Sequence, residues 1–260
     1  MRARWVVIGM GLLIVASASA QRPEPITIAV LEAPGVGADA LATAVAAIDG
    51  ARGMRARRVT PEEVRGGALD GARAALFTGG RGSVQGQMLG EEGRERVRAF
   101  VRGGGGYVGI CAGAYMALQG APEFHKIALV AGRHATGDAW IRGIAPLRVT
   151  PGDGSTPLAL HYANGPMIGA EAIDGIAPFV TLATFAEEIA SEENGTHAGE
   201  MRGMPAAIAA GYGRGRVVLF SPNPTLDPAH PDLLVGALRF AARGGAIDPG
   251  TGWRDVVTAR

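Results

Sequence analysis

The first half of the chain alternates short apolar runs with amphipathic stretches. Residues 26–31 form a continuous apolar run, which is typical of a buried strand. Residues 38–48 then show helical periodicity that ends at Gly50, and the same alternation continues as far as residue 118. The pattern predicts further strands at 54–59, 74–77 and 107–110, and further helices from Pro61 and over 91–102 and 112–118. Strands that alternate with helices predict βαβ units and a mainly parallel sheet.

The second half has strand-like segments separated by turn residues. Two of these segments flank Gly213-Arg214-Gly215 and predict an antiparallel hairpin. A closing helix is expected over 233–242, and a loosely held tail over 244–260. With no linker visible, residues 21–243 are predicted to form one α/β domain. The predicted strands of this half are 139–149, 158–162, 179–185, 206–212 and 216–220.

The N-terminus has the pattern of a cleavable secretory signal. Arg2 and Arg4 precede an apolar run over 5–16, and Ala18-Ser19-Ala20 is a small-x-small cleavage site. A membrane anchor is the alternative, but the run is shorter than the roughly 18 to 20 residues that a spanning helix needs. We therefore expect residues 1–20 to be removed, the mature chain to be periplasmic or secreted, and no membrane span to remain. Without a cysteine at the cleavage point, a lipoprotein is not expected.

Composition narrows the classes of partner. The chain has 260 residues, 47% of them apolar, and a net charge of +1 from 25 basic and 24 acidic residues. This balance gives no electrostatic reason to expect nucleic acid or an anionic membrane surface as a partner. Nearly every cation is arginine, which we interpret as a habit of composition. One cysteine excludes an internal disulfide, so in an oxidising compartment the thiol is either buried and inert or used.

That cysteine lies in the segment Gly109-Ile110-Cys111-Ala112-Gly113, at a predicted strand-to-helix junction. A nucleophile in the G-x-nucleophile-x-G pattern occupies a sharp, strained turn where flanking side chains would clash. The N–H of Ala112 is expected to donate to an oxyanion, with a second donor from the Gly79-Gly80 loop, and the helix N-terminus favours a thiolate. The alternative is a buried cysteine at a tight turn, with glycines present only for geometry.

Several segments together resemble the class I glutamine amidotransferase-like superfamily, and most closely the N-terminal domain of biotin–protein ligases and its free-standing relatives. The resemblance implies a flavodoxin-like three-layer sandwich over residues 26–243, with a mainly parallel sheet and an antiparallel hairpin region near the C-terminus. Ligation of biotin is not implied, because the ligase catalytic domain is absent. The segments that carry the resemblance are 77–80, 103–115, 162–166 and 213–222.

One segment departs from the superfamily pattern. In active members, His-Pro-Glu follows the strand that corresponds to 217–220, whereas here the residues are Asn223-Pro224-Thr225. Asparagine cannot take a proton from a thiol, and threonine cannot carry the charge of the acid. The resemblance therefore leaves the Cys-His-Glu triad incomplete at Asn223 and Thr225. His161, in the matching segment, and His230, after the Asn223 loop, are the substitutes to consider as base.

No cofactor or metal is expected. His125, His134 and His197 lack ligand spacing, and the GxGxxG pattern at residues 104–109 precedes a strand instead of following one. Three functions stay open at this point. The protein is a cysteine-dependent amidase or hydrolase acting on a small carbonyl compound, a non-catalytic relative that binds a ligand or partner, or a redox protein that uses the Cys111 thiol.

Overall fold

The computed structural model describes residues 24–137 and 140–260. The predicted signal peptide and its cleavage site lie outside these residues. Within the described ranges, no helix combines the length and apolar character needed to cross a membrane.

A nine-stranded sheet runs through the described part of the chain, in the order β2-β1-β3-β4-β11-β10-β9-β6-β7. The pairs from β2 to β11 are parallel, and those from β11 to β7 are antiparallel. This confirms the predicted α/β class with a mainly parallel first half, and the hairpin at Gly213 is present as β10–β11. The strands are β1 Ile26–Leu31, β2 Met54–Val59, β3 Ala74–Phe77, β4 Gly106–Ile110, β6 Ile144–Pro151, β7 Leu158–Ala163, β9 Val180–Phe185, β10 Pro205–Tyr212 and β11 Gly215–Phe220. A small separate sheet pairs β5 Gly132–His134 with β8 Ile168–Ala170.

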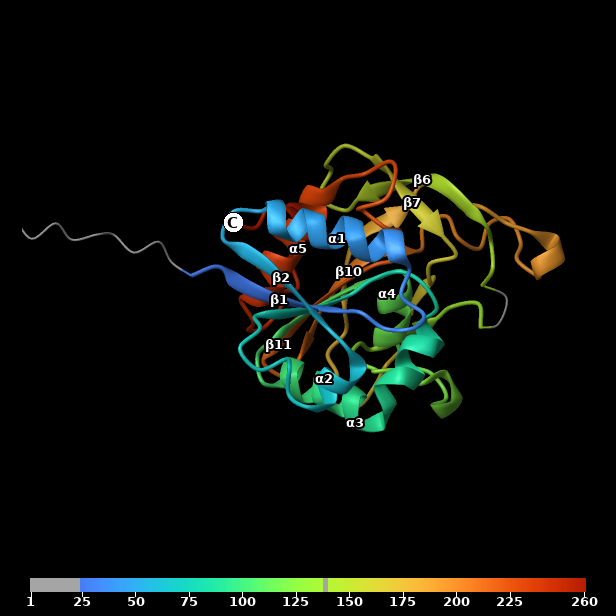
Figure 1. Ribbon diagram of the computed structural model, residues 1–260. Coiled ribbons are helices and arrows are strands. Elements are labelled where there is room, and N and C mark those ends of the chain that lie inside the picture. The colour runs from blue at the N-terminus through green and yellow to red at the C-terminus, as the bar shows by residue number, and fades with distance from the viewer. Residues whose placement is uncertain (1–23, 138–139) are drawn as a thin grey trace, which may run out of the picture.

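Helices cover both faces of the sheet and make the three layers (Figure 1). On one face lie α1 Ala38–Gly50, α5 Pro231–Ala242 and α6 Trp253–Val257. On the other lie α2 Pro61–Arg65, α3 Gly82–Arg102 and α4 Ala112–Ala117. Short 3-10 turns occur at Pro122–Phe124 and Glu192–Asn194. The predicted capping box starts α2, because the Thr60 hydroxyl accepts from the N–H of Glu63 while the Glu63 carboxylate accepts from the N–H of Thr60.

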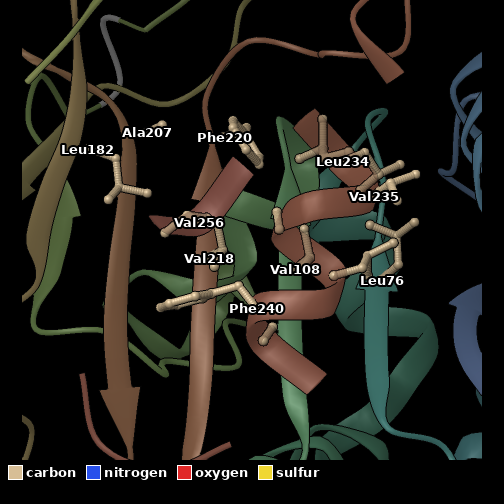
Figure 2. Close-up of a cluster of buried hydrophobic side chains, with 14 of the residues drawn as sticks. Leu76, Val108, Leu182, Ala207, Val218, Phe220, Leu234, Val235, Phe240 and Val256 are labelled. Atoms are coloured by element: carbon tan, nitrogen blue, oxygen red, sulfur yellow. The ribbon is translucent and has the colours of Figure 1, made fainter. Parts of the chain in front are cut away.

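The two faces of the sheet bury two apolar clusters. In the first, Phe220, Val218 and Val108 from the central strands pack against Leu234 of α5 and Val256 of α6 (Figure 2). The second lies between the opposite face of the same strands and helices α2, α3 and α4. Because both faces are covered, the central strands are apolar throughout, which is why they are visible in the sequence as continuous runs.

Two parts of the fold differ from the expectations. Helix α3 begins at Gly82 instead of residue 91, since a kink at Gly90 (φ 65°, ψ 175°) joins two helical pieces of which only the second has an apolar stripe. The prediction that residues 244–260 form a loosely held tail is also wrong. Its helix α6 packs on α5, and Trp253 and Val256 are buried in the first core cluster. A short helix that contributes only two or three apolar side chains gives almost no periodicity to detect.

Candidate active site

The carboxyl ends of the parallel strands meet at one edge of the sheet, and Cys111 lies there between β4 and α4. It has φ 52° and ψ −103°, a conformation that costs a non-glycine residue energy. The bracketing glycines allow this close turn. A Cβ at Gly109 would lie 2.7 Å from the backbone of Gly113, and one at Gly113 would lie 1.9 Å from the carbonyl oxygen of Phe77. Strand β4 and helix α4 can therefore approach only with glycine at both positions.

Two backbone N–H groups, from Gly80 and Ala112, hydrogen-bond the sulfur of Cys111. Gly80 follows β3 with φ 132°, and a Cβ there would lie 2.0 Å from the carbonyl oxygen of Gly35. The loop after β1 fixes it further, since the N–H of Arg81 donates to Gly35 (2.7 Å) and that of Gly37 donates to Gly79 (2.9 Å). The two N–H groups predicted from the sequence thus both lie at the sulfur of Cys111.

Burial raises the pKa of the Cys111 thiol above its ordinary value, and the hydrogen bonds from Gly80 and Ala112 oppose this effect. The thiol lies 3.5 Å from the carbonyl oxygen of Ala163, to which it donates. Desolvation therefore outweighs the helix N-terminus, and Cys111 is a neutral thiol at neutral pH. This argues against the helix-activated thiolate considered from the sequence, and a nucleophilic Cys111 needs a base.

Asn223 and Thr225 occupy the expected triad edge but are bonded to each other. Asn223 Oδ1 accepts from the backbone N–H of Thr225 (2.8 Å) and from its hydroxyl (2.9 Å), and both residues are buried. The Thr225 hydroxyl also lies 2.9 Å from that of Thr43 on α1. Asn223 and Cys111 both lie close to Gly79 and line one cavity. A Cβ placed on Gly79 would be 3.7 Å from the Cys111 Cβ and 3.9 Å from Asn223 Nδ2. A neutral, inward-bonded cluster replaces the base and acid of the active pattern.

Of the two histidines considered as substitutes, His161 shares a cavity with Cys111. This cavity has a volume of about 330 Å³ and is also lined by Ala163 and Asn223. The backbone carbonyl of His161 accepts from the N–H of Asn223 (2.7 Å), and its Nδ1 lies 3.1 Å from the carbonyl oxygen of Asp227. His230 instead precedes α5, where its N–H donates to the carbonyl of Pro224 (2.7 Å), and it lines neither cavity that contains Cys111.

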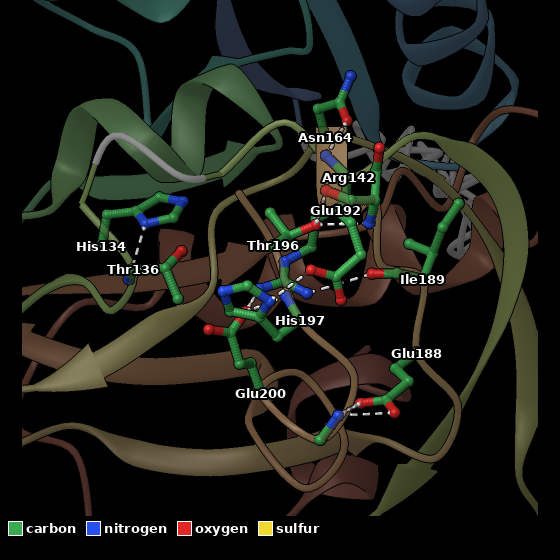
Figure 3. A network of polar contacts seen from close by, with 12 residues as sticks. His134, Thr136, Arg142, Asn164, Glu188, Ile189, Glu192, Thr196, His197 and Glu200 are labelled. Carbon is green, nitrogen blue, oxygen red and sulfur yellow. Dashed lines mark hydrogen bonds and ion pairs between the residues drawn. The ribbon is translucent and has the colours of Figure 1, made fainter. Parts of the chain in front are cut away.

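A second cavity, of about 220 Å³, opens on the other side of Cys111 and is lined by Asn164. Asn164, with φ 52°, accepts at Oδ1 from the N–H groups of Arg142 (2.8 Å) and Gly143 (2.6 Å). The fully buried Arg142 side chain is held in turn by Glu200 (2.5 Å) and the carbonyl of Ile189 (3.1 Å) (Figure 3). Because Oδ1 is occupied, the Nδ2 group of Asn164 is the end left to meet a ligand.

Two aromatic residues that also line this cavity, Tyr115 and Trp140, were not identified as site residues from the sequence. Tyr115 lies one helical turn after Cys111, so its position on the same face of α4 follows from helix geometry. Trp140 comes from a loop with no periodicity. Among the described residues, no cluster of three or more His, Cys, Asp or Glu side chains has the arrangement of a metal site.

Comparison with known proteins identifies the architecture. A crystal structure of a glutamine amidotransferase superposes with a TM-score of 0.51 and 20% identity, over 78% of this chain and 89% of that one. PurLQS from Thermotoga maritima superposes with a TM-score of 0.54 and 14% identity, over 77% of this chain and 88% of that one. The chain therefore has the class I glutamine amidotransferase-like fold that its sequence resembles.

The family-level likeness is more local. Residues 69–129, which contain Gly80, Cys111 and Ala112, match the sequence model described as "Biotin-protein ligase, N terminal". No curated protein sequence matches the chain.

Proposed function

We propose that the protein is an exported, glutamine amidotransferase-like amidase or hydrolase in which Cys111 attacks a small carbonyl compound. Sγ would add to the carbonyl carbon, and the N–H groups of Gly80 and Ala112 would hold the oxyanion. The C–N or C–O bond would then break, the leaving group would take up the thiol proton, and water would hydrolyse the thioester.

The observation that carries this proposal is the pair of N–H groups from Gly80 and Ala112 on the sulfur of Cys111, with open cavities beside it. Both donors already lie at the sulfur, so both are close to the place where an oxyanion would form after attack by Sγ. His161 is the histidine in the cavity with Cys111, so it is the candidate to take the thiol proton and return it to the leaving group.

An activated acyl ester, p-nitrophenyl acetate, tests this mechanism in the mature chain from Gln21. We expect hydrolysis that is lost in Cys111→Ala and falls by about tenfold to a hundredfold in His161→Ala, as for loss of a general base. His230→Ala is the matched control and should keep the wild-type rate, because His230 lines neither cavity. Equal rates for wild type and Cys111→Ala would exclude a nucleophilic cysteine.

The pH profile of Cys111 alkylation, read by intact mass with Cys111→Ala as blank, gives a second test. Because burial raises the pKa of this thiol, the protonated form persists to higher pH. The alkylation rate should keep rising beyond about 8.5, the pKa of an ordinary thiol. A midpoint below that value would indicate a thiolate and favour the redox function over this proposal.

A non-catalytic binding domain is the second candidate, and the Asn223–Thr225 cluster favours it. Both side chains are buried and bonded to each other, so the positions expected for base and acid do no proton transfer. The two cavities beside Cys111 would then hold a ligand without chemistry. In that case Cys111→Ala would retain ligand affinity, and no hydrolysis would depend on Cys111.

A further inference from the structure

A larger cavity adjoins the Cys111 site and has no part in the mechanism above. It has a volume of about 490 Å³, and it shares Tyr115 and Trp140 with the smaller cavity that contains Cys111. The two rings stack with their centroids 6.0 Å apart and an interplanar angle of 21°. A ligand in the larger cavity would therefore lie directly behind the aromatic wall of the Cys111 site.

Lys126 lines this cavity and is the single lysine of a chain whose other cations are arginines. It is 8% exposed, and its Nζ donates to the carbonyl oxygen of Tyr115 (2.6 Å) and lies over the Tyr115 ring. None of the ion pairs among the described residues includes it. Burial lowers the pKa of Lys126 to about 6, so without a ligand its side chain is mostly a neutral amine at neutral pH. An anionic ligand beside Nζ would raise this pKa again and favour the ammonium form.

His134 also lines this cavity, and its ring has a donor without a partner among the described residues. Its Nδ1 accepts from the N–H of Thr136 (3.3 Å), so the proton of the neutral ring is on Nε2. That Nε2 atom is buried and has no hydrogen-bond partner among the described residues. Burial, with the nearby charges of Lys126 and Arg142, lowers the pKa of His134 to about 4, so at neutral pH the ring is uncharged and its Nε2–H is able to donate to a ligand.

The remaining walls are aromatic and apolar. The His134 ring meets the Tyr115 and Trp140 rings edge-on, at centroid distances of 6.5 and 6.0 Å, and Phe124 and Ile173 also line the cavity. The other charges, Arg133 and Glu171, pair with each other at the rim. The cavity thus combines a flat apolar surface with two donors: the Lys126 amine, which has no carboxylate partner among the described residues and would become charged beside an anion, and the neutral His134 ring.

We propose that the cavity formed by Tyr115, Lys126, His134 and Trp140 binds an aromatic carboxylate. The carboxylate would meet Lys126 Nζ and His134 Nε2, and the ring would lie against Tyr115 and Trp140. Binding itself is independent of Cys111. We also infer that the aromatic carboxylate is one end of the substrate that Cys111 attacks, and this second step rests on the proposed function.

Benzoate is the probe, titrated calorimetrically into the mature chain beside benzamide, cyclohexanecarboxylate and inorganic phosphate. Benzamide lacks the charge, cyclohexanecarboxylate lacks the flat ring, and phosphate has the charge alone. We expect benzoate to bind tightest and benzamide to bind at least about tenfold more weakly, as for loss of a charge-assisted hydrogen bond. Equal affinities for benzoate and benzamide, or phosphate binding as tightly as benzoate, would overturn the proposal.

Lys126→Met keeps the length of the side chain and removes the amine that would become charged beside the carboxylate, and should weaken benzoate binding by about tenfold or more. Arg133→Met is the matched control. It removes a cation from the same cavity, but one already paired with Glu171, so the expected change is below about threefold. Cys111→Ala should leave benzoate affinity unchanged, so this binding proposal can be tested even if the catalytic proposal fails. If Lys126→Met lowers thermal stability but not affinity, Lys126 only caps the carbonyl end of α4 and the proposal is wrong.

A further measurement uses the wild-type protein, so it does not depend on whether a variant folds. Because Lys126 is the only lysine, a small amine-acylating reagent followed by peptide mass mapping reports on one side chain. Saturating benzoate should slow acylation of Lys126, and benzamide at the same concentration should not. Acylation at the same rate with and without benzoate would contradict the proposed site.

Discussion

At the scale of single residues, Asn223 has the greatest consequence for chemistry. Its Oδ1 is occupied by the two donors of Thr225, and the Thr225 hydroxyl is in contact with Thr43. Neither Asn223 nor Thr225 can draw the proton from Cys111, whose thiol donates to the carbonyl of Ala163 instead. Burial raises the pKa of the Cys111 thiol, and the neutral Asn223 cluster supplies no positive charge that would lower it.

Restoring histidine at position 223 and glutamate at position 225, as in the superfamily pattern, should lower the pKa of the Cys111 thiol. In the double variant Asn223→His/Thr225→Glu, an imidazolium beside the sulfur would lower the thiol pKa, so Cys111 alkylation at pH 7 should be faster by about tenfold or more. Alkylation rates read by intact mass check this. Thr225→Glu alone is the control, since it adds negative charge without a base and should give no gain. An unchanged rate in the double variant would mean that position 223 does not reach the sulfur.

At the scale of elements, the junction of β4 and α4 decides whether a site exists at all. Gly109 and Gly113 let the strand and the helix touch, and Gly113 also packs on the Phe77 carbonyl at the end of β3. Cys111, just before α4, lines the cavities of about 220 and 330 Å³. Tyr115, one turn later, lines the cavity of about 220 Å³ and the larger one of about 490 Å³. Tyr115 therefore lies between the Cys111 site and the larger cavity.

Gly113→Ala should therefore destabilise the fold by about 3 kcal/mol or more, because the added methyl group would overlap backbone that two other elements hold in place. Gly50→Ala is the matched control. Gly50 ends α1 with open space around it, so alanine there should change stability by less than about 1 kcal/mol. Urea unfolding of both variants measures the difference. Similar midpoints for the two would show that the elbow can relax around a side chain.

The same elements show what a pattern of residues can reveal. The runs 26–31, 74–77 and 216–220 are apolar throughout because they lie in the covered centre of the sheet, and they were predicted within one residue. The first half of α3 was missed, since its glycines and polar residues carry no stripe before the kink at Gly90. Elements that contribute a full apolar face are predictable, whereas those held by a few contacts are not.

At the scale of the whole molecule, the C-terminal segment is part of the core. Trp253 of α6 is 4% exposed and meets Phe220 of β11 edge-on, with ring centroids 6.2 Å apart. Phe220 is the last residue of β11, and its carbonyl accepts from the N–H of Cys111 (2.8 Å). The end of the chain thus supports the strand that in turn positions the elbow.

Trp253→Ala should cost about 3 to 5 kcal/mol of unfolding free energy, the usual range when a buried tryptophan is removed. The loss should appear as a lower urea midpoint for the whole domain. Arg254→Ala is the matched control, because that neighbouring side chain is exposed and its loss should have little effect. A wild-type midpoint in Trp253→Ala would show that α6 adds little to the stability of the domain, as expected for a loosely held tail.

The sequence by itself determined the α/β class, the resemblance to glutamine amidotransferases and the position of the nucleophile elbow. These follow from apolar runs and from glycines at fixed spacing, which are local properties of the chain. The sequence also named Gly80, His161 and His230 as groups that could act with Cys111, and Asn223 as the residue at the expected position of the base. Only the tertiary structure decided that Gly80 after β3, His161 of β7 and Asn223 after β11 share a cavity with Cys111, whereas His230 does not line it. It also decided that desolvation prevails over the helix N-terminus, and that the single lysine lies behind Tyr115. Burial and proximity between distant segments depend on how the whole sheet folds, and no local pattern encodes them.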